Sequence, residues 1–162
     1  MPEVGDPAPE ITLPMAGGDA YDDIEPFALS EVLSDGPVVL AFFPAAFTGG
    51  CTEELCTFRD ELASFESLDA GVYGISVDLP FALNVFSMEQ DLTFPLLSDF
   101  DGETIEAYDV VLEGVHGLGG VAERSVFVVD TDGVIRYRWV REDGNPDFEW
   151  LAEQVREAVA AL

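Results

Sequence analysis

The sequence contains no lysine. All six basic residues are arginines, they stand against 33 aspartates and glutamates, and the formal net charge is −27. A protein that binds nucleic acid neutralises phosphates with basic side chains, which are too few here to form such a surface. An anionic membrane would repel the same surface. The composition therefore argues against nucleic-acid and membrane partners.

The acidic residues are spread along the whole chain, and the first basic residue is Arg59. Such an excess of acid disfavours the compact state by self-repulsion, which salt screens. Abundant acid combined with the exclusion of lysine resembles the proteome bias of extreme halophiles. We therefore expect a halophilic source, although an acidic protein from low-salt surroundings would also fit this composition.

Long apolar runs are also missing, so nothing in the sequence predicts a membrane-spanning helix. The N-terminal stretch "MPEVGDPAPEITLP" lacks both the basic and the apolar regions of a signal peptide. We therefore expect a cytoplasmic protein. Its 162 residues fit a single domain, 1–162, and a hydrophobic content of 48% argues against disorder.

Short apolar runs bounded by turn residues predict the strands. They lie at 37–44, 71–78 and 124–130, with a shorter candidate at 94–99. Asp132-Gly133 follows the third run and precedes another β-rich stretch, which indicates a hairpin. The glycine-rich segment 112–121 does not have the strand-to-helix context of a phosphate-binding loop, so we interpret it as a flexible surface loop.

Helical patterns alternate with these strands. Apolar residues spaced by three and four predict a helix from Thr52 to Leu68, and a second helix is expected at 80–91. The C-terminal stretch predicts a third helix with Asn145 as its N-cap and Pro146 at its first position. The order of elements predicts an α/β fold with a mixed β-sheet, partly parallel, flanked by helices.

Both cysteines of the chain lie in the stretch "FFPAAFTGGCTEELCTFRD", residues 42–60. Cys51 is expected in the first turn of the helix that follows a buried strand. Unsatisfied N–H groups and the positive end of the helix dipole favour a thiolate there, which is the form that attacks electrophiles. Gly49-Gly50 leaves the approach to the sulfur free of side-chain bulk, whereas a buried structural cysteine would need no such opening.

The spacing Pro44-x-x-x-Thr48-x-x-Cys51 after an apolar strand resembles the signature of the peroxiredoxin family. Further segments are similar to that family, and together they cover nearly the whole chain: "VGDPAPEITLP", "ISVDLPFALNVF", "FPLLSD" and "RSVFVVDTDGVIRY". The resemblance implies a thioredoxin-like fold and a thiol-dependent peroxidase that reduces hydrogen peroxide and organic hydroperoxides. It implies no metal and no organic cofactor.

The resemblance also assigns roles to residues of this chain. Cys51 would be the peroxidatic nucleophile, and the hydroxyl of Thr48 would hydrogen-bond the peroxide oxygens. Pro44 would shield the sulfur from water. Arg124 would stabilise the thiolate and the departing oxygen, although an arginine in so acidic a chain could instead form a solvent-facing ion pair.

Cys56 is the remaining thiol, and no cysteine follows it. The C-x-x-x-x-C spacing resembles the bacterioferritin-comigratory subfamily, in which the second cysteine resolves the oxidised first one as an intramolecular disulfide. An intact helix would hold the two Cα atoms roughly 8–9 Å apart and the side chains about 140° apart, farther than a disulfide allows. The resolving role therefore requires local unwinding, and a one-cysteine enzyme with Cys56 as a buried apolar residue remains the alternative.

Several other features carry less information. Glu54 and Arg59 have a spacing close to that of a surface ion pair, and we assign neither a chemical step. The single histidine, His116, and two cysteines make a zinc site improbable. The electron donor would be a thioredoxin- or glutaredoxin-like protein or a small thiol, and the protein would be a monomer or homodimer. A thiol–disulfide oxidoreductase would be expected to carry C-x-x-C, which is absent, and a non-catalytic acidic binding module is a further alternative.

Overall fold

The structure is a computed structural model that describes residues 1–114 and 116–162. The strands of the described part are β1 (Thr12–Ala16), β2 (Glu25–Ala28), β3 (Val38–Phe42), β4 (Gly71–Ser76), β5 (Leu96–Ser98), β6 (Val111–Leu112), β7 (Val121–Ala122), β8 (Ser125–Val129) and β9 (Ile135–Val140). The helices are α1 (Leu29–Val32), α2 (Gly49–Asp60), α3 (Leu62–Glu66), α4 (Pro80–Glu89), α5 (Glu103–Ala107) and α6 (Phe148–Ala160).

Seven strands form one mixed sheet in the order β2-β1-β5-β4-β3-β8-β9. The pairs β3–β4 and β4–β5 are parallel, while β8 and β9 form the predicted antiparallel hairpin. Strands β1 and β2 were not predicted from the sequence. They form an antiparallel pair that extends the sheet beyond β5.

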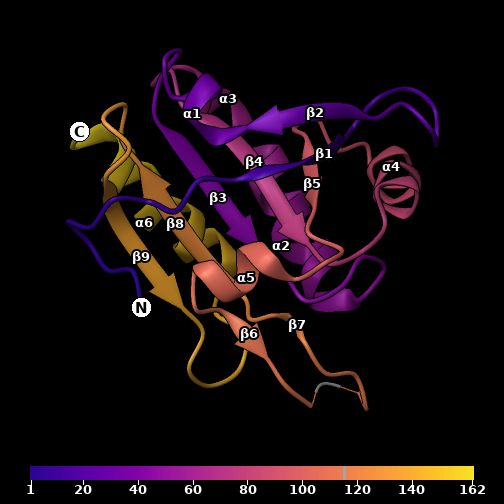
Figure 1. The fold of residues 1–162 in the computed structure, drawn as a ribbon. Helices are drawn as coiled ribbons and strands as arrows, with labels where there is room; N and C mark the ends of the chain where they lie inside the picture. Colours follow the sequence, from indigo (N-terminus) through magenta and orange to yellow (C-terminus); the bar gives the residue numbers. More distant parts are fainter. Residues whose placement is uncertain (115) are drawn as a thin grey trace.

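The central strand β3 is buried on both faces, which explains its uninterrupted apolar sequence. Side chains alternate along a strand, so Val39 and Ala41 face one hydrophobic cluster while Leu40 and Phe42 face the other. Helices α2, α4 and α6 contribute to the first cluster, and α1 and α5 contribute to the second. Figure 1 shows α5 in front of the sheet, with α2 and α6 behind it. The predicted mixed sheet flanked by helices is therefore confirmed.

Two of the predicted helices differ from the observed ones. The helix expected from Thr52 to Leu68 starts earlier, at Gly49, and is divided into α2 and α3 at Glu61, which has φ −94° and ψ 0°. The prediction that Asn145 caps the last helix is wrong. Asp147 is the N-cap of α6, where its carboxylate accepts the backbone N–H groups of Glu149 and Trp150, so Pro146 precedes the helix.

The glycine-rich segment 112–121 is bordered by a short antiparallel ladder. Val111 pairs with Ala122 and Leu112 with Val121, so the ends of the predicted surface loop are joined to each other. Position 115, within this loop, lies outside the described residues. Among the described residues, no helix is both long enough and apolar enough to cross a membrane.

Candidate active site

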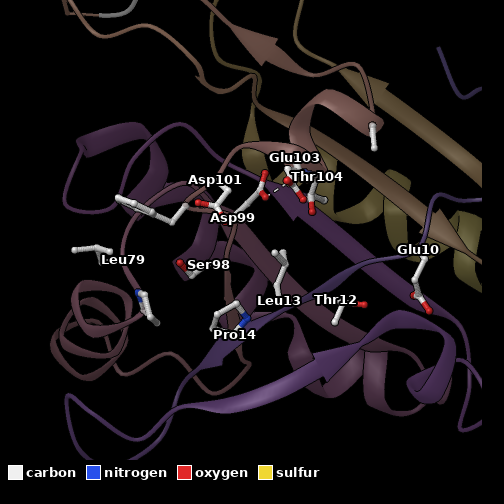
Figure 2. A pocket seen from close by; sticks show the side chains of 13 residues that line it. Glu10, Thr12, Leu13, Pro14, Leu79, Ser98, Asp99, Asp101, Glu103 and Thr104 are labelled. Atoms are coloured by element: carbon white, nitrogen blue, oxygen red, sulfur yellow. Dashed lines mark hydrogen bonds between the residues drawn. The ribbon is translucent and has the colours of Figure 1, made fainter.

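One cleft of about 390 Å³ has acidic walls, and neither cysteine lines it (Figure 2). It is lined by side chains of β1, the start of α4 and the segment 98–107. Its most buried carboxylate, Asp99, accepts the backbone N–H groups of Thr104 (3.1 Å) and Ile105 (2.9 Å). Burial raises the pKa of Asp99. We interpret Asp99 as the residue that holds the start of α5 in place.

Cys51 is the third residue of α2 and has only 1% of its surface exposed. Thr48 occupies the N-cap position, and its backbone carbonyl accepts the N–H of Thr52 at 2.9 Å. The Thr48 hydroxyl does not cap the helix but donates to the carbonyl of Ala45 at 2.8 Å. Since that bond uses the hydroxyl hydrogen, the exposed Thr48 oxygen is left as an acceptor beside the helix N-terminus.

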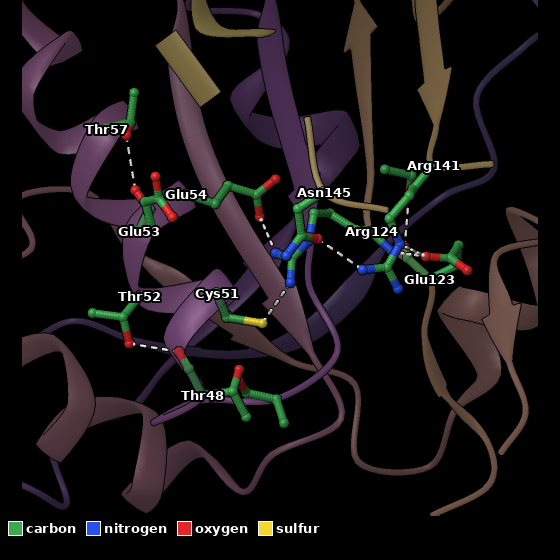
Figure 3. A network of polar contacts seen from close by, with 12 residues as sticks. Thr48, Cys51, Thr52, Glu53, Glu54, Thr57, Glu123, Arg124, Arg141 and Asn145 are labelled. Carbon is green, nitrogen blue, oxygen red and sulfur yellow. Dashed lines mark hydrogen bonds and ion pairs between the residues drawn. The ribbon is translucent and has the colours of Figure 1, made fainter. Parts of the chain in front are cut away.

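Arg124 directly contacts the sulfur of Cys51, as Figure 3 shows. Its Nη2 lies 3.2 Å from Cys51 Sγ, although the two residues are 73 positions apart. They meet because β3 and β8 are neighbouring antiparallel strands. Phe42 at the end of β3 pairs with Ser125, the residue after Arg124, and the chain beyond β3 leads to Cys51. Arg124 is 3% exposed, so the alternative of a solvent-facing ion pair is wrong.

Glu54 is the buried partner of Arg124, a contact that was not predicted from the sequence. Its Oε1 accepts Nη1 of Arg124 at 3.1 Å, while Oε2 has no hydrogen-bond partner among the described residues. Burial raises the pKa of Glu54 to about 7, although Arg124 opposes this effect. Burial also disfavours the charge on Arg124, but Glu54 and Cys51 outweigh it and raise the Arg124 pKa. Arg124 is therefore the fixed charge of the cluster, and Glu54 is a group that can gain or lose a proton near neutral pH.

The expected pair of Glu54 and Arg59 does not form. Arg59 instead binds Asp60, with Nη2 and Oδ1 3.0 Å apart, and donates from Nη1 to the carbonyl of Gln90. The reason is the helix periodicity: five residues correspond to about 500°, which turns the two side chains to different faces of α2.

Asn145 completes the contacts of Arg124 from the turn between β9 and α6. Its Oδ1 accepts Nε of Arg124 at 3.0 Å and Nη1 of Arg141 at 2.8 Å. Arg141 also donates from Nε to Glu123 Oε1 at 2.8 Å. All of these side chains lie around the same cluster in Figure 3. The contacts of Asn145 and Arg141 were not predicted, because no local sequence pattern links either residue to Arg124 or Cys51.

The loop that carries Pro44 and Thr48 is tied to the end of β4. The backbone N–H of Ala46 donates to Asp78 Oδ2 at 2.8 Å, and the Ser76 hydroxyl donates to the same oxygen at 2.7 Å. Pro44 is buried. Phe47 has a φ of +67°, a conformation that costs energy in a residue with a side chain and is maintained by its surroundings. The loop is therefore held in one conformation by the protein around it.

Cys56 lies in the middle of the same helix, with its thiol free and partly buried. Its Sγ is 3.7 Å from Oε1 of Gln90, at the end of α4. Both cysteines belong to the continuous helix α2, so the predicted separation of roughly 8–9 Å between their Cα atoms applies. In the described part of the chain, no group of three or more His, Cys, Asp or Glu side chains is placed to hold a metal ion.

Solved structures define the fold class. Peroxidoxin BcpB from Mycobacterium tuberculosis is 33% identical, with a TM-score of 0.86 over 100% of this chain and 99% of that chain. The bacterioferritin comigratory protein of Xanthomonas campestris is 27% identical, with a TM-score of 0.77 over 93% of this chain and 90% of that one. The protein thus has a thioredoxin-like α/β fold with a central mixed sheet flanked by helices.

The family follows from the sequence comparison. The profile of the AhpC/TSA family matches residues 4–138. A Coxiella burnetii protein named "Putative peroxiredoxin bcp" is 37% identical over 149 residues, which cover 88% of this chain and 93% of that protein. The chain belongs to the AhpC/TSA family and is a peroxiredoxin, a thiol peroxidase.

Proposed function

We propose that this enzyme reduces hydrogen peroxide and organic hydroperoxides at Cys51 and that Cys56 then resolves the oxidised sulfur. The observation that supports this most directly is the 3.2 Å contact between Arg124 Nη2 and Cys51 Sγ at the N-terminus of α2. A guanidinium and a helix N-terminus both favour a thiolate, and they also lie where negative charge develops when a peroxide bond breaks.

The first step transfers one oxygen atom to the protein. The Cys51 thiolate attacks the terminal oxygen of the hydroperoxide, an S–O bond forms and the O–O bond breaks. Cys51 becomes a sulfenic acid, and the departing alkoxide or hydroxide takes up a proton to leave as alcohol or water. The Thr48 oxygen is free to accept a hydrogen bond from the bound peroxide, Arg124 stabilises the departing oxygen, and Pro44 shields the sulfur from water.

The second step forms a disulfide. The Cys56 thiolate attacks the sulfenic sulfur of Cys51, which releases hydroxide that is protonated to water. The first turns of α2 must unwind for this step, because a disulfide needs Cα atoms less than about 7 Å apart. A one-cysteine cycle, in which an external thiol attacks the sulfenic acid instead, is the alternative, and the two free thiols of the reduced enzyme are compatible with either cycle.

The remaining parts of the proposal concern the setting of the enzyme. A thioredoxin- or glutaredoxin-like protein, or a small thiol, would return two electrons and two protons to the disulfide. We propose that residues 1–162 act as one domain, as a monomer or homodimer, in the cytoplasm, and in high salt that screens the charge of −27.

Peroxide consumption with dithiothreitol in concentrated salt tests the proposal on three proteins: the wild type, Cys51→Ser and Cys56→Ser. We expect Cys51→Ser to abolish consumption. Cys56→Ser should still react with one equivalent of peroxide, but mass spectrometry should find a sulfenic acid in place of the Cys51–Cys56 disulfide formed by the wild type. Activity that survives Cys51→Ser would disprove the mechanism, and a stable sulfenic acid in the wild type would favour the one-cysteine cycle. Reduction of insulin disulfides without peroxide consumption would identify an oxidoreductase instead.

A further inference from the structure

The turn between β9 and α6 contributes a residue to the site that lies outside the part of the chain matched by the family profile. The match ends at residue 138, whereas Arg141 and Asn145 follow it. Asn145 reaches back so that its Oδ1 lies 3.0 Å from Nε of Arg124 and 2.8 Å from Nη1 of Arg141. One amide oxygen thus links two of the six arginines of the chain.

The three nitrogens of the Arg124 guanidinium each have a different partner. Nη2 contacts Cys51, Nη1 contacts Glu54, and Nε contacts Asn145. A planar guanidinium is fixed in orientation when its N–H groups are bonded along separate directions. The contacts to Cys51 and Glu54 come from helix α2, so the Asn145 contact is the hydrogen bond that fixes Arg124 from a separate segment, the turn between β9 and α6.

The chemistry of an amide suits this position. An aspartate would bind both arginines equally well, but its negative charge would compete with Cys51 and Glu54 for the positive charge of Arg124. The neutral amide oxygen accepts the same two hydrogen bonds without adding a third anion to the cluster. Asn145 is exposed to solvent and uncharged, so its contact with Arg124 adds no buried charge to the site.

Gly50 provides the room for this contact. A Cβ added at Gly50 would lie 2.7 Å from Nδ2 of Asn145 and 3.3 Å from Nη2 of Arg124. Any side chain there would have to displace the amide. The absence of a side chain beside Cys51, which is itself only 1% exposed, therefore serves the approach of Asn145.

We propose that Asn145 is a positioning residue for peroxide reduction, whose amide oxygen holds the Arg124 guanidinium over Cys51 and links it to Arg141. The proposal rests on Cys51 being the nucleophile, as proposed above. It assigns to the turn 141–147 a part in the activity that is distinct from capping α6.

The test measures the rate constant for the reaction of the full-length enzyme with hydrogen peroxide. Asn145→Ala should slow this reaction about tenfold, because a small misplacement of a charge-stabilising group is costly in rate. Asn145→Asp keeps an acceptor oxygen and should lose less. Asp143→Asn, which changes an exposed residue of the same turn, serves as the control and should stay within about twofold, as is usual for surface substitutions.

A double-mutant cycle separates positioning from a general structural effect. If Asn145 acts through Arg124, Asn145→Ala should cost almost nothing further in an Arg124→Lys background, where the Nε contact no longer exists. Gly50→Ala should slow the wild type but add little to Asn145→Ala. The proposal would be overturned if the fold-changes of the single variants multiply in both double variants, or if Asn145→Ala reacts as fast as the wild type. Thermal unfolding of each variant shows whether it is folded. If Asn145→Ala does not fold, Asn145→Asp replaces it in the test.

Failure of the proposed function would look different. If the wild type does not react with peroxide, the peroxidase mechanism fails, while alkylation of Cys51 by iodoacetamide still reports on the Arg124 contact. Slower alkylation in Asn145→Ala than in the wild type would support the positioning role in that case. Equal alkylation rates would reject it.

Discussion

Cys51 and Cys56 lie on one helix five positions apart, but they differ in helix position, in burial and in the side chain that contacts the sulfur. Cys51 is in the first turn, 1% exposed, and contacts a guanidinium at 3.2 Å. Cys56 is in mid-helix, partly exposed, and its sulfur is 3.7 Å from the neutral side-chain oxygen of Gln90. The effect of the helix N-terminus fades within about one turn, and Arg124 donates its hydrogen bond to the sulfur of Cys51. Position along one helix therefore gives the two thiols different chemical surroundings.

The largest expected effect comes from removing the charge beside Cys51. Arg124→Gln should slow the reaction with peroxide by about 10²–10³-fold, which is the usual cost of losing a donor that stabilises developing negative charge. Stopped-flow measurement of the oxidation of reduced enzyme checks this. The matched control is Arg59→Gln, which removes the arginine one turn after Cys56 and should leave that first step unchanged. An equal loss in both variants would mean that the two thiols are not distinguished by their arginines.

A second prediction concerns the helix that separates the two sulfurs. One equivalent of peroxide should convert the wild type to a disulfide and unwind the start of α2, so backbone amides of residues 52–56 should lose protection from hydrogen exchange. Mass spectrometry of exchange before and after oxidation measures this. Cys56→Ser cannot form the bond, so its α2 should remain protected after the same treatment. Unchanged protection in an oxidised wild type that contains the disulfide would contradict the need for unwinding.

Glu54 lies between the two cysteines and should make stability depend on pH. Its pKa is raised from 4.5 to about 7 in the folded protein, so the folded state favours the protonated carboxyl. This shift adds to the free energy of unfolding. The contribution is fully present below about pH 4.5 and is lost as the pH rises to about 7, and it amounts to on the order of 3 kcal/mol at most.

Glu54→Gln removes this titration, so its stability relative to that of the wild type should increase between pH 4.5 and 7. Urea unfolding of both proteins at several pH values in constant salt gives the difference. A difference that does not change with pH would mean that Glu54 keeps its charge throughout this range.

The smallest effect is expected at the partner of Cys56. Gln90→Ala removes the weak contact to the thiol, a neutral hydrogen bond that contributes about 1 kcal/mol or less. Alkylation of Cys56 should become faster by a few-fold at most, and the reaction of Cys51 with peroxide should not change. A large change in peroxide reactivity would indicate that α4 communicates with Cys51 as well as with Cys56.

Much of the fold could be predicted because its central strands are apolar on both faces. The runs that became β3, β4 and β8 stand out in the sequence for this reason. The edge pair β1 and β2 did not, since both strands are short, partly exposed and contain Pro14 and Pro26. The break at Glu61 was also missed, because it has no glycine or proline to mark it.

Only those features of the site that depend on neighbouring residues in the sequence could be predicted. Cys51 was expected in the first turn of a helix, and it is the third residue of α2. Asn145 has good capping chemistry and a proline after it, yet its side chain binds Arg124 while Asp147 caps α6. Whether Asn145 caps α6 or binds Arg124 depends on a residue 21 positions away, which local sequence rules do not consider.

The two arginines joined by Asn145 have a consequence for which molecules can reach the sulfur. Each of them is paired with a carboxylate, Arg124 with Glu54 and Arg141 with Glu123, so they do little to offset the net charge of −27. An uncharged hydroperoxide crosses the surrounding field freely, whereas an anionic oxidant or an anionic thiol is repelled before it arrives. The net negative charge of the chain thus acts as an electrostatic filter, open to neutral oxidants and more restrictive toward anions as the ionic strength falls.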